Sequence, residues 1–153
     1  MNKRKQEDRL ARFIDLASNL KPQRYRVAIA CGDISSGKSG IAQAAGRRLL
    51  ARYIDLAGDL MPRMTLPEFS PTLGAFGPDN LAKWLMHEAD QLEVRFLIVD
   101  QIEPLLATFG RTQAVLFFSM VSRAEPRRPV ILVTYLKKQI QEAVFPAERV
   151  LHL

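Results

Sequence analysis

Apolar runs alternate with segments of helical periodicity along most of the chain. Helical spacing of apolar positions is found in segments 6–20, 41–52, 81–92, 112–124 and 137–144, and a shorter helix starts at Ile102. Short, nearly unbroken apolar runs, which are typical of strands, cover residues 25–30, 53–56, 94–100, 129–135 and 149–153. Such strands alternating with helices indicate a parallel sheet with helices on both faces. The pattern therefore predicts an α/β fold with three αβα layers and a five-stranded, mostly parallel sheet.

One segment interrupts this alternation. Residues 61–78 are rich in proline and glycine, which predicts a long loop, and Asp79 or Asn80 can cap the helix that follows it. The length of 153 residues fits one domain. We divide it into an N-terminal helix and linker at 1–22 and an αβα core at 23–153.

Composition narrows the class of protein. With 48% hydrophobic and 25% charged residues, the chain is typical of a globular domain that has a sizeable core. Its basic start turns amphipathic where a signal peptide needs an apolar run, and no window approaches the ~18 consecutive apolar residues of a membrane span. We therefore expect a cytoplasmic protein without membrane contact. The single cysteine, Cys31, lies in an apolar run and is expected to be buried.

A complete phosphate-loop pattern, G-x-x-x-x-G-K-[ST], follows the first predicted strand. The matching residues are Gly32, Asp33, Ile34, Ser35, Ser36, Gly37, Lys38 and Ser39, with Gly40 next in the chain. In such a loop the glycines let backbone N–H groups surround phosphate oxygens, the lysine reaches the β and γ phosphates, and the serine hydroxyl binds magnesium. The helix that follows adds the anion preference of its N-terminus. The sequence therefore predicts a site for ATP and Mg²⁺ at residues 32–40.

The most apolar strand ends in an acid. In phosphate-loop NTPases an acid at this place holds magnesium opposite the loop serine, so Asp100 is the second candidate metal ligand beside Ser39. Where many ATP-driven proteins carry a glutamate that activates water, this chain has Gln101. An amide is a poor proton acceptor, so we expect slow hydrolysis. Glu103 is the alternative base, and an exposed surface role for it is equally open.

The order of these elements resembles the additional-strand ATPases, which include the AAA+ and RecA-like proteins. The resemblance implies a phosphate-loop NTPase core in which the strand at 129–135 lies between the loop strand and the Asp100 strand. It implies that Thr134 senses the γ phosphate and that Arg149 reaches into the site of a neighbouring subunit. The sequence departs from the family at Gln101, and because it stops after the fifth strand we expect no C-terminal helical lid.

At a narrower level, the length, the loop and the "VDQIEPL" strand end are similar to the BrxF family, the small phosphate-loop proteins of type III BREX phage-exclusion systems. The implied role is a nucleotide-dependent subunit of an anti-phage assembly. Its implied partners are further copies of itself or a larger ATPase of the same system. Two alternatives stay open: a small-molecule kinase, for which the long loop offers only Arg63, and a scaffold that does not hydrolyse ATP.

The charge adds a further expectation. The formal net charge is +6, with one basic cluster at Lys3, Arg4 and Lys5 and another at residues 123–128. The second cluster contains Arg123, Arg127 and Arg128. Solvated surface is the ordinary explanation of such clusters, and non-specific, salt-sensitive contact with DNA is the functional one.

Overall fold

The computed structural model describes residues 2–60, 76–91 and 93–153. Five strands form one sheet in which every neighbouring pair is parallel. The strands are β1 (Val27–Cys31), β2 (Arg52–Asp55), β3 (Leu97–Asp100), β4 (Val130–Thr134) and β5 (Val150–His152). Their order in the sheet is β2-β3-β4-β1-β5. The predicted α/β class is confirmed, and so is the position of β4 between the Asp100 strand and the strand that leads into the phosphate-loop pattern.

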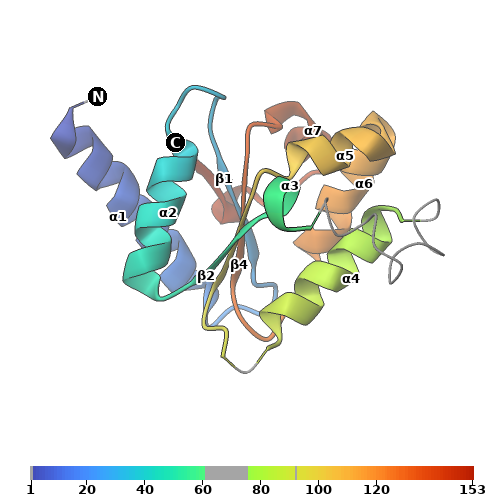
Figure 1. Cartoon of the computed structure of the whole chain (residues 1–153), viewed down its shortest axis with the longest axis horizontal. Coiled ribbons are helices and arrows are strands. Elements are labelled where there is room, and N and C mark those ends of the chain that lie inside the picture. Colours follow the sequence, from blue (N-terminus) through green and yellow to red (C-terminus); the bar gives the residue numbers. More distant parts are fainter. Residues whose placement is uncertain (1, 61–75, 92) are drawn as a thin grey trace.

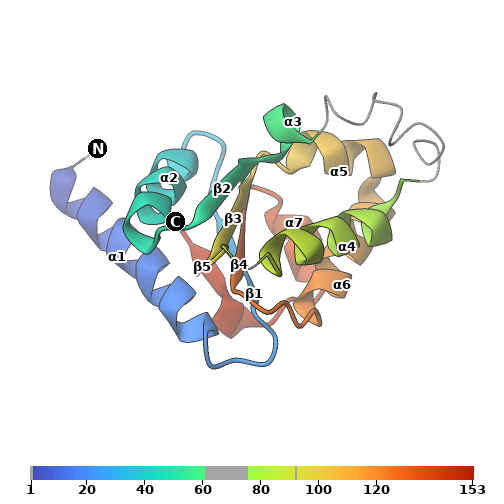
Figure 2. The same ribbon diagram turned by 60° about the horizontal axis from the view of Figure 1, so that its bottom comes forward.

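Helices cover both faces of this sheet (Figures 1 and 2). They are α1 (Lys3–Leu20), α2 (Lys38–Leu49), α3 (Leu56–Asp59), α4 (Pro78–Ala89), α5 (Glu103–Phe109), α6 (Arg111–Ser122) and α7 (Lys137–Glu142), and a 3-10 turn, Ala147–Arg149, precedes β5. On one face α1 and α2 pack against the sheet, while α4, α5, α6 and α7 pack on the other. The result is the expected three-layer arrangement.

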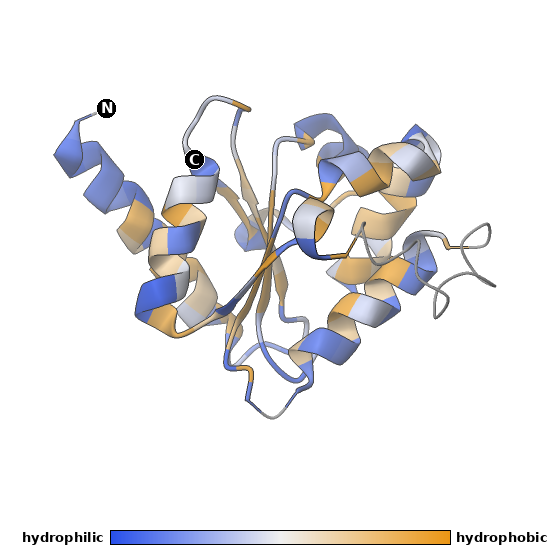
Figure 3. Cartoon of the chain, viewed as in Figure 1, coloured by the Kyte–Doolittle hydropathy of each residue, from blue (hydrophilic) through white to orange (hydrophobic). Residues whose placement is uncertain are grey.

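Each strand supplies side chains to both cores. In β1, Val27 and Ile29 belong to the cluster under α4 to α7, whereas Ala28 and Ala30 belong to the cluster under α1 and α2. This alternation follows from the two-residue period of a strand. Figure 3 shows the consequence, with apolar residues along the strands and polar residues on the outer surfaces of α1 and α2.

The N-terminal helix is part of this packing. It begins at Lys3, three residues before the predicted start, because the Asn2 side chain accepts a hydrogen bond from the N–H of Arg4 at 3.0 Å. Phe13 and Ala17 are fully buried in the core beneath α1 and α2. The first helix therefore belongs to the same folded unit as the αβα core.

Most other elements differ from the prediction by one to three residues at their ends; α4, for example, begins at Pro78, where the pattern began at residue 81. The second helix begins at Lys38, where the sequence pattern placed its start at residue 41, and α3 was not predicted at all. In α3 the Asp55 side chain accepts from the N–H of Gly58 at 3.0 Å, which caps a turn too short to give a periodic pattern. Most of the predicted long loop, with Arg63, lies outside the described residues.

The all-parallel sheet has two chemically distinct edges. We call the edge where the strands end the carboxyl edge, and the edge where they begin the amino edge. The loops after β1, β3 and β4 all lie at the carboxyl edge, and α2 starts there. Within the described chain, no single helix has the length and apolar character of a membrane span. Helices α5 and α6 together are long and apolar enough, but the chain bends by 118° between them.

Candidate functional site

The phosphate-loop pattern forms a tight turn at the carboxyl edge. The N–H of Gly32 donates to the Thr134 carbonyl at 3.1 Å, and the N–H of Ser36 donates to the Asp33 carbonyl at 3.0 Å. Gly37 then adopts φ +77°, a left-handed conformation that glycine reaches without steric penalty. A Cβ on Gly32 would lie only 2.6 Å from the Ser36 hydroxyl oxygen. The backbone conformation at position 37 thus favours glycine, and a side chain at position 32 would force the Ser36 hydroxyl to move.

The turn leads directly into the N-terminus of α2. No side chain caps this helix, so its first N–H groups are available to an external acceptor. Helix N-termini attract anions through these donors and through the helix dipole. In the described residues the Ser36 hydroxyl oxygen is also buried without a hydrogen-bond partner. Apart from the N–H groups of Gly32 and Ser36, the loop and the start of α2 thus offer donors that have no partner among the described residues.

Lys38 is the first residue of α2 and is largely buried, with 7% of its surface exposed. Its ammonium lies 3.5 Å from the Asp33 carbonyl oxygen and 5.5 Å from the centre of the Tyr135 ring. Neither contact is strong, because the hydrogen bond is at the limit of length and the other partner is an aromatic face. The positive charge therefore lies over the loop, and no carboxylate of the described residues pairs with it. Ser39, the next residue, is half-buried.

Asp100 ends β3 and is 1% exposed. One carboxylate oxygen accepts from the N–H of Gln101 at 2.8 Å, and the other accepts from the Tyr53 hydroxyl at 2.5 Å. Ile98, two residues earlier, packs in the cluster under α1 and α2, so Asp100 faces the same side of the sheet as α2. The acid and the start of the phosphate loop helix therefore share both an edge and a face of the sheet.

Tyr53 is a site residue that the sequence did not identify. It lies on β2 beside β3, and burial raises the pKa of its hydroxyl, with the hydrogen bond to Asp100 as the next cause. A phenol with a raised pKa stays protonated and donates. Its place could have been inferred only from the register that pairs Asp55 with Asp100 and Tyr53 with Ile98.

The remaining predicted site residues at the carboxyl edge are Gln101, Glu103 and Thr134. Gln101 has φ +58° and an exposed side chain, so no described contact fixes its amide. The Glu103 carboxylate, in contrast, is buried and accepts from the N–H of Tyr135 at 3.1 Å. Thr134 is fully buried, and its hydroxyl oxygen accepts from the N–H of Leu136 at 3.2 Å. Glu103 and Thr134 therefore lie together at the carboxyl edge, and an exposed surface role for Glu103 is wrong.

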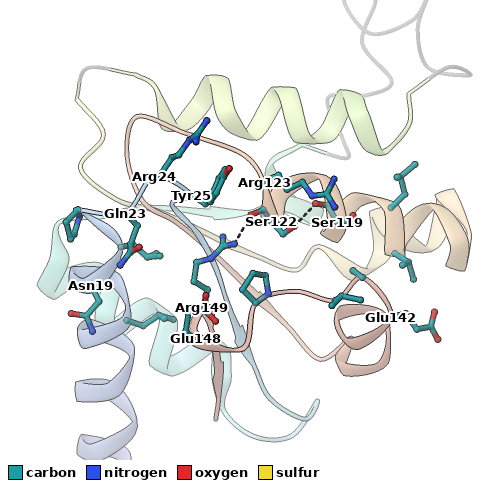
Figure 4. A pocket seen from close by; sticks show the side chains of 18 of the residues that line it. Asn19, Gln23, Arg24, Tyr25, Ser119, Ser122, Arg123, Glu142, Glu148 and Arg149 are labelled. Carbon is teal, nitrogen blue, oxygen red and sulfur yellow. Dashed lines mark hydrogen bonds between the residues drawn. The ribbon is translucent and has the colours of Figure 1, made fainter.

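Arg149 is not brought to this site. It ends the 3-10 turn before β5, at the amino edge, and its guanidinium donates to the Val27 carbonyl at 2.7 Å. It also donates to the Ser122 carbonyl at 2.7 Å (Figure 4). Only 8% of the residue is exposed, and burial lowers its pKa from the ordinary value. A side chain whose donors serve main-chain carbonyls does not reach out of the molecule. Within the chain the contacts of Arg149 are those of a structural residue, and its expected role in a neighbouring subunit's site stays a prediction.

A cavity of about 1380 Å³ lies beside Arg149, away from the phosphate loop. Figure 4 shows it between the end of α1, α6 and the segment that follows α7. Its lining combines apolar side chains with polar ones, including Arg24, which forms an ion pair with Glu125. None of the predicted nucleotide-binding residues lines it, so we do not assign the nucleotide to this cavity.

Comparison with known families matched no family model, and comparison with curated proteins gave no match either.

The predicted burial of Cys31 is confirmed, since it is 4% exposed at the end of β1, and burial raises the pKa of its thiol.

Proposed function

We propose that this chain is a magnesium-dependent ATP-binding protein of the additional-strand phosphate-loop type. The observation that carries the proposal is the turn at residues 32–37, which ends in the left-handed Gly37 and opens an uncapped helix on the same edge and face as Asp100. That arrangement supplies unpaired N–H donors, a cation and a carboxylate to one region, which is the chemistry that a nucleotide triphosphate with magnesium requires. Direct titration with ATP and magnesium tests it.

In this proposal each residue has one task. Residues 32–40 would form the phosphate site, in which the N–H groups at the start of α2 would hold the phosphates and Lys38 would neutralise the β and γ phosphates. Ser39 and Asp100 would hold the magnesium ion, whose charge offsets that of the phosphate oxygens. Thr134, buried at the end of β4 beside the loop strand, is the candidate contact for the γ phosphate.

Tyr53 would act on the metal through Asp100. Groups that hydrogen-bond to a metal ligand orient it, and their removal typically weakens metal affinity about 10- to 100-fold. We expect Tyr53→Phe to raise the magnesium concentration needed for half-maximal ATP binding at least about tenfold, while ATP affinity without magnesium stays the same. Magnesium titrations at fixed ATP measure this, with Tyr25→Phe as the remote control. An unchanged magnesium dependence would remove Tyr53 from the site.

Hydrolysis is proposed to be slow or to depend on a partner. The Gln101 amide is a poor proton acceptor, and a positioned carboxylate base typically contributes ~10²–10⁴-fold to such a step. We expect Gln101→Glu to leave ATP affinity nearly unchanged and to raise the basal rate of phosphate release. Glu103→Gln is the matched comparison, because an amide oxygen can still accept from the Tyr135 N–H. Brisk wild-type turnover that falls in Glu103→Gln would instead make Glu103 the base.

We infer that the nucleotide state controls assembly, either with further copies of the chain or with a larger ATPase. The resemblance to the BrxF family supports a place in an anti-phage system. The left-handed backbone at Gln101 and its exposed side chain leave this position open to a partner's residue. Mass measurement in solution, with and without ATP and magnesium, tests the self-assembly form of this proposal.

A further inference from the structure

Every strand of the sheet begins beside an arginine. Arg52 is the first residue of β2, Arg26 and Arg149 directly precede β1 and β5, and two more stand two residues before β3 and β4. In sheet order the row is Arg52, Arg95, Arg128, Arg26 and Arg149. Because all five strands are parallel, the whole row lies at the amino edge, opposite the phosphate loop. Neighbouring strands are about 4.8 Å apart, which sets the spacing of the row.

Part of this row serves the fold. Arg52 pairs with Glu88, and Arg149 is buried on two carbonyls. Arg26 donates to the carbonyls of Lys21 and Pro126 at 3.0 and 3.1 Å. The helices that precede the strands also end at this edge, and helix C-termini favour cations. These contacts account for three of the arginines without any ligand.

For Arg95 and Arg128, which precede β3 and β4, the structure shows no such contacts among the described residues. Arg95 and Arg128 line a cavity of about 540 Å³ together with Lys21, and its other lining residues are Glu93 and Val94. The Nε of Arg128 is buried without a partner among the described residues, and Arg95 is exposed. Three cations thus surround a cavity that contains a single carboxylate.

More positive charge flanks this cavity. Arg127, whose side chain is exposed, adjoins Arg128, whereas Arg123 follows the end of α6 and lines the cavity beside Arg149. The carboxylate of Asp90 is engaged by the Arg127 N–H at 2.8 Å, and that of Glu125 by Arg24 at 2.6 Å. Glu125 is thus paired with Arg24, while Asp90 keeps its charge and Glu93 lines the cavity. Among the described residues, the cations Lys21, Arg95, Arg127 and Arg128 still outnumber these two carboxylates.

We propose that the amino edge around Arg95 and Arg128 is a binding surface for the phosphate backbone of nucleic acid. Arg95 and Arg128 precede two neighbouring strands and have Lys21 beside them, so they can contact successive phosphates of a linear polyanion. Guanidinium groups bind phosphate oxygens in a bidentate manner. Contacts of this kind position a nucleic acid without reading its bases. The inference does not depend on the nucleotide site, which lies at the other edge.

The basic cluster at the N-terminus lies far from the proposed surface. Lys3 and Lys5 lie in the first turn of α1, whereas Lys21 follows its last residue. A helix of 18 residues is about 27 Å long, so the two ends are far apart. Lys3 and Lys5 therefore lie outside the proposed surface, and their substitution is a control with the same change in net charge.

Fluorescence anisotropy with a labelled DNA duplex and its single strand tests the proposal. We expect wild-type binding of either form at 50 mM salt, with log K falling linearly against log salt. The variant Arg95→Gln/Arg128→Gln should bind at least about tenfold more weakly, and its salt slope should be smaller by about two, because each lost phosphate contact removes about one unit. Lys3→Gln/Lys5→Gln should stay within about twofold of wild type.

Three results would overturn the proposal: no binding by the wild type at 50 mM salt, equal losses in both double variants, or binding of phosphatidylserine vesicles without binding of DNA. Arg95→Gln alone guards against a folding defect, because this side chain is exposed and its replacement is expected to keep wild-type stability. It should reduce the salt slope by about one.

Discussion

Arg149→Ala is expected to lower the free energy of unfolding by roughly 3–5 kcal/mol. The guanidinium makes two hydrogen bonds to main-chain carbonyls, and bonds to charged groups are typically worth about 1.5–3 kcal/mol each. Alanine leaves both carbonyls without their donor and removes the packing of the side chain against Phe145. For a chain of this size the loss corresponds to a fall in Tm of about 10 °C. Urea unfolding followed by circular dichroism measures it.

Two comparisons make this result specific. Arg123→Ala changes an exposed arginine that lines the same cavity and should alter stability by no more than about 0.5 kcal/mol. Arg149→Lys keeps the charge but has one nitrogen for two carbonyls, so it should recover only part of the loss. If Arg149→Ala unfolds at the same urea concentration as wild type and instead loses ATP-dependent assembly, the trans-acting role would be right and the structural role wrong.

Lys38→Ala is expected to abolish the thermal stabilisation that ATP and magnesium give the wild type. At an ATP concentration one hundred times Kd, the ligand should stabilise the native state by about 2.7 kcal/mol, which corresponds to a rise in Tm of about 5–10 °C. The variant loses the cation that faces the β and γ phosphates. Without nucleotide its stability should hardly change, because the ammonium has only a 3.5 Å contact with a carbonyl and the Tyr135 ring.

Lys83→Ala, an exposed lysine on α4, is the matched control and should keep the full ATP-induced rise. Equal stabilisation of wild type and Lys38→Ala by ATP would mean that the nucleotide binds elsewhere. The cavity beside Arg149 would then be the next place to examine.

The features that the sequence predicted are those that short-range patterns specify. Apolar runs of strand length predicted the parallel sheet, because strands that are buried on both faces have apolar residues at nearly every position. The phosphate-loop pattern occupies consecutive residues, so its turn and the helix after it could be inferred together. The start of that helix was placed three residues too late, because apolar periodicity begins only at Ile41 while Gly37 already turns the chain into the helix.

The features that the sequence did not predict depend on contacts between distant residues. Tyr53 meets Asp100 only through the register of β2 and β3, and Arg149 meets Val27 and Ser122 across the fold. The arginine row likewise exists only because five parallel strands start at one edge. No periodic pattern along the chain encodes such pairings, since they are set by tertiary packing.

The most direct test of the account is calorimetric titration of ATP into the wild-type chain, once with magnesium and once with EDTA. We predict saturable binding at one site per chain that is clearly tighter with magnesium, because Ser39 and Asp100 would share the ion with the phosphates. Absence of saturable binding at millimolar ATP with magnesium present would contradict the proposed function.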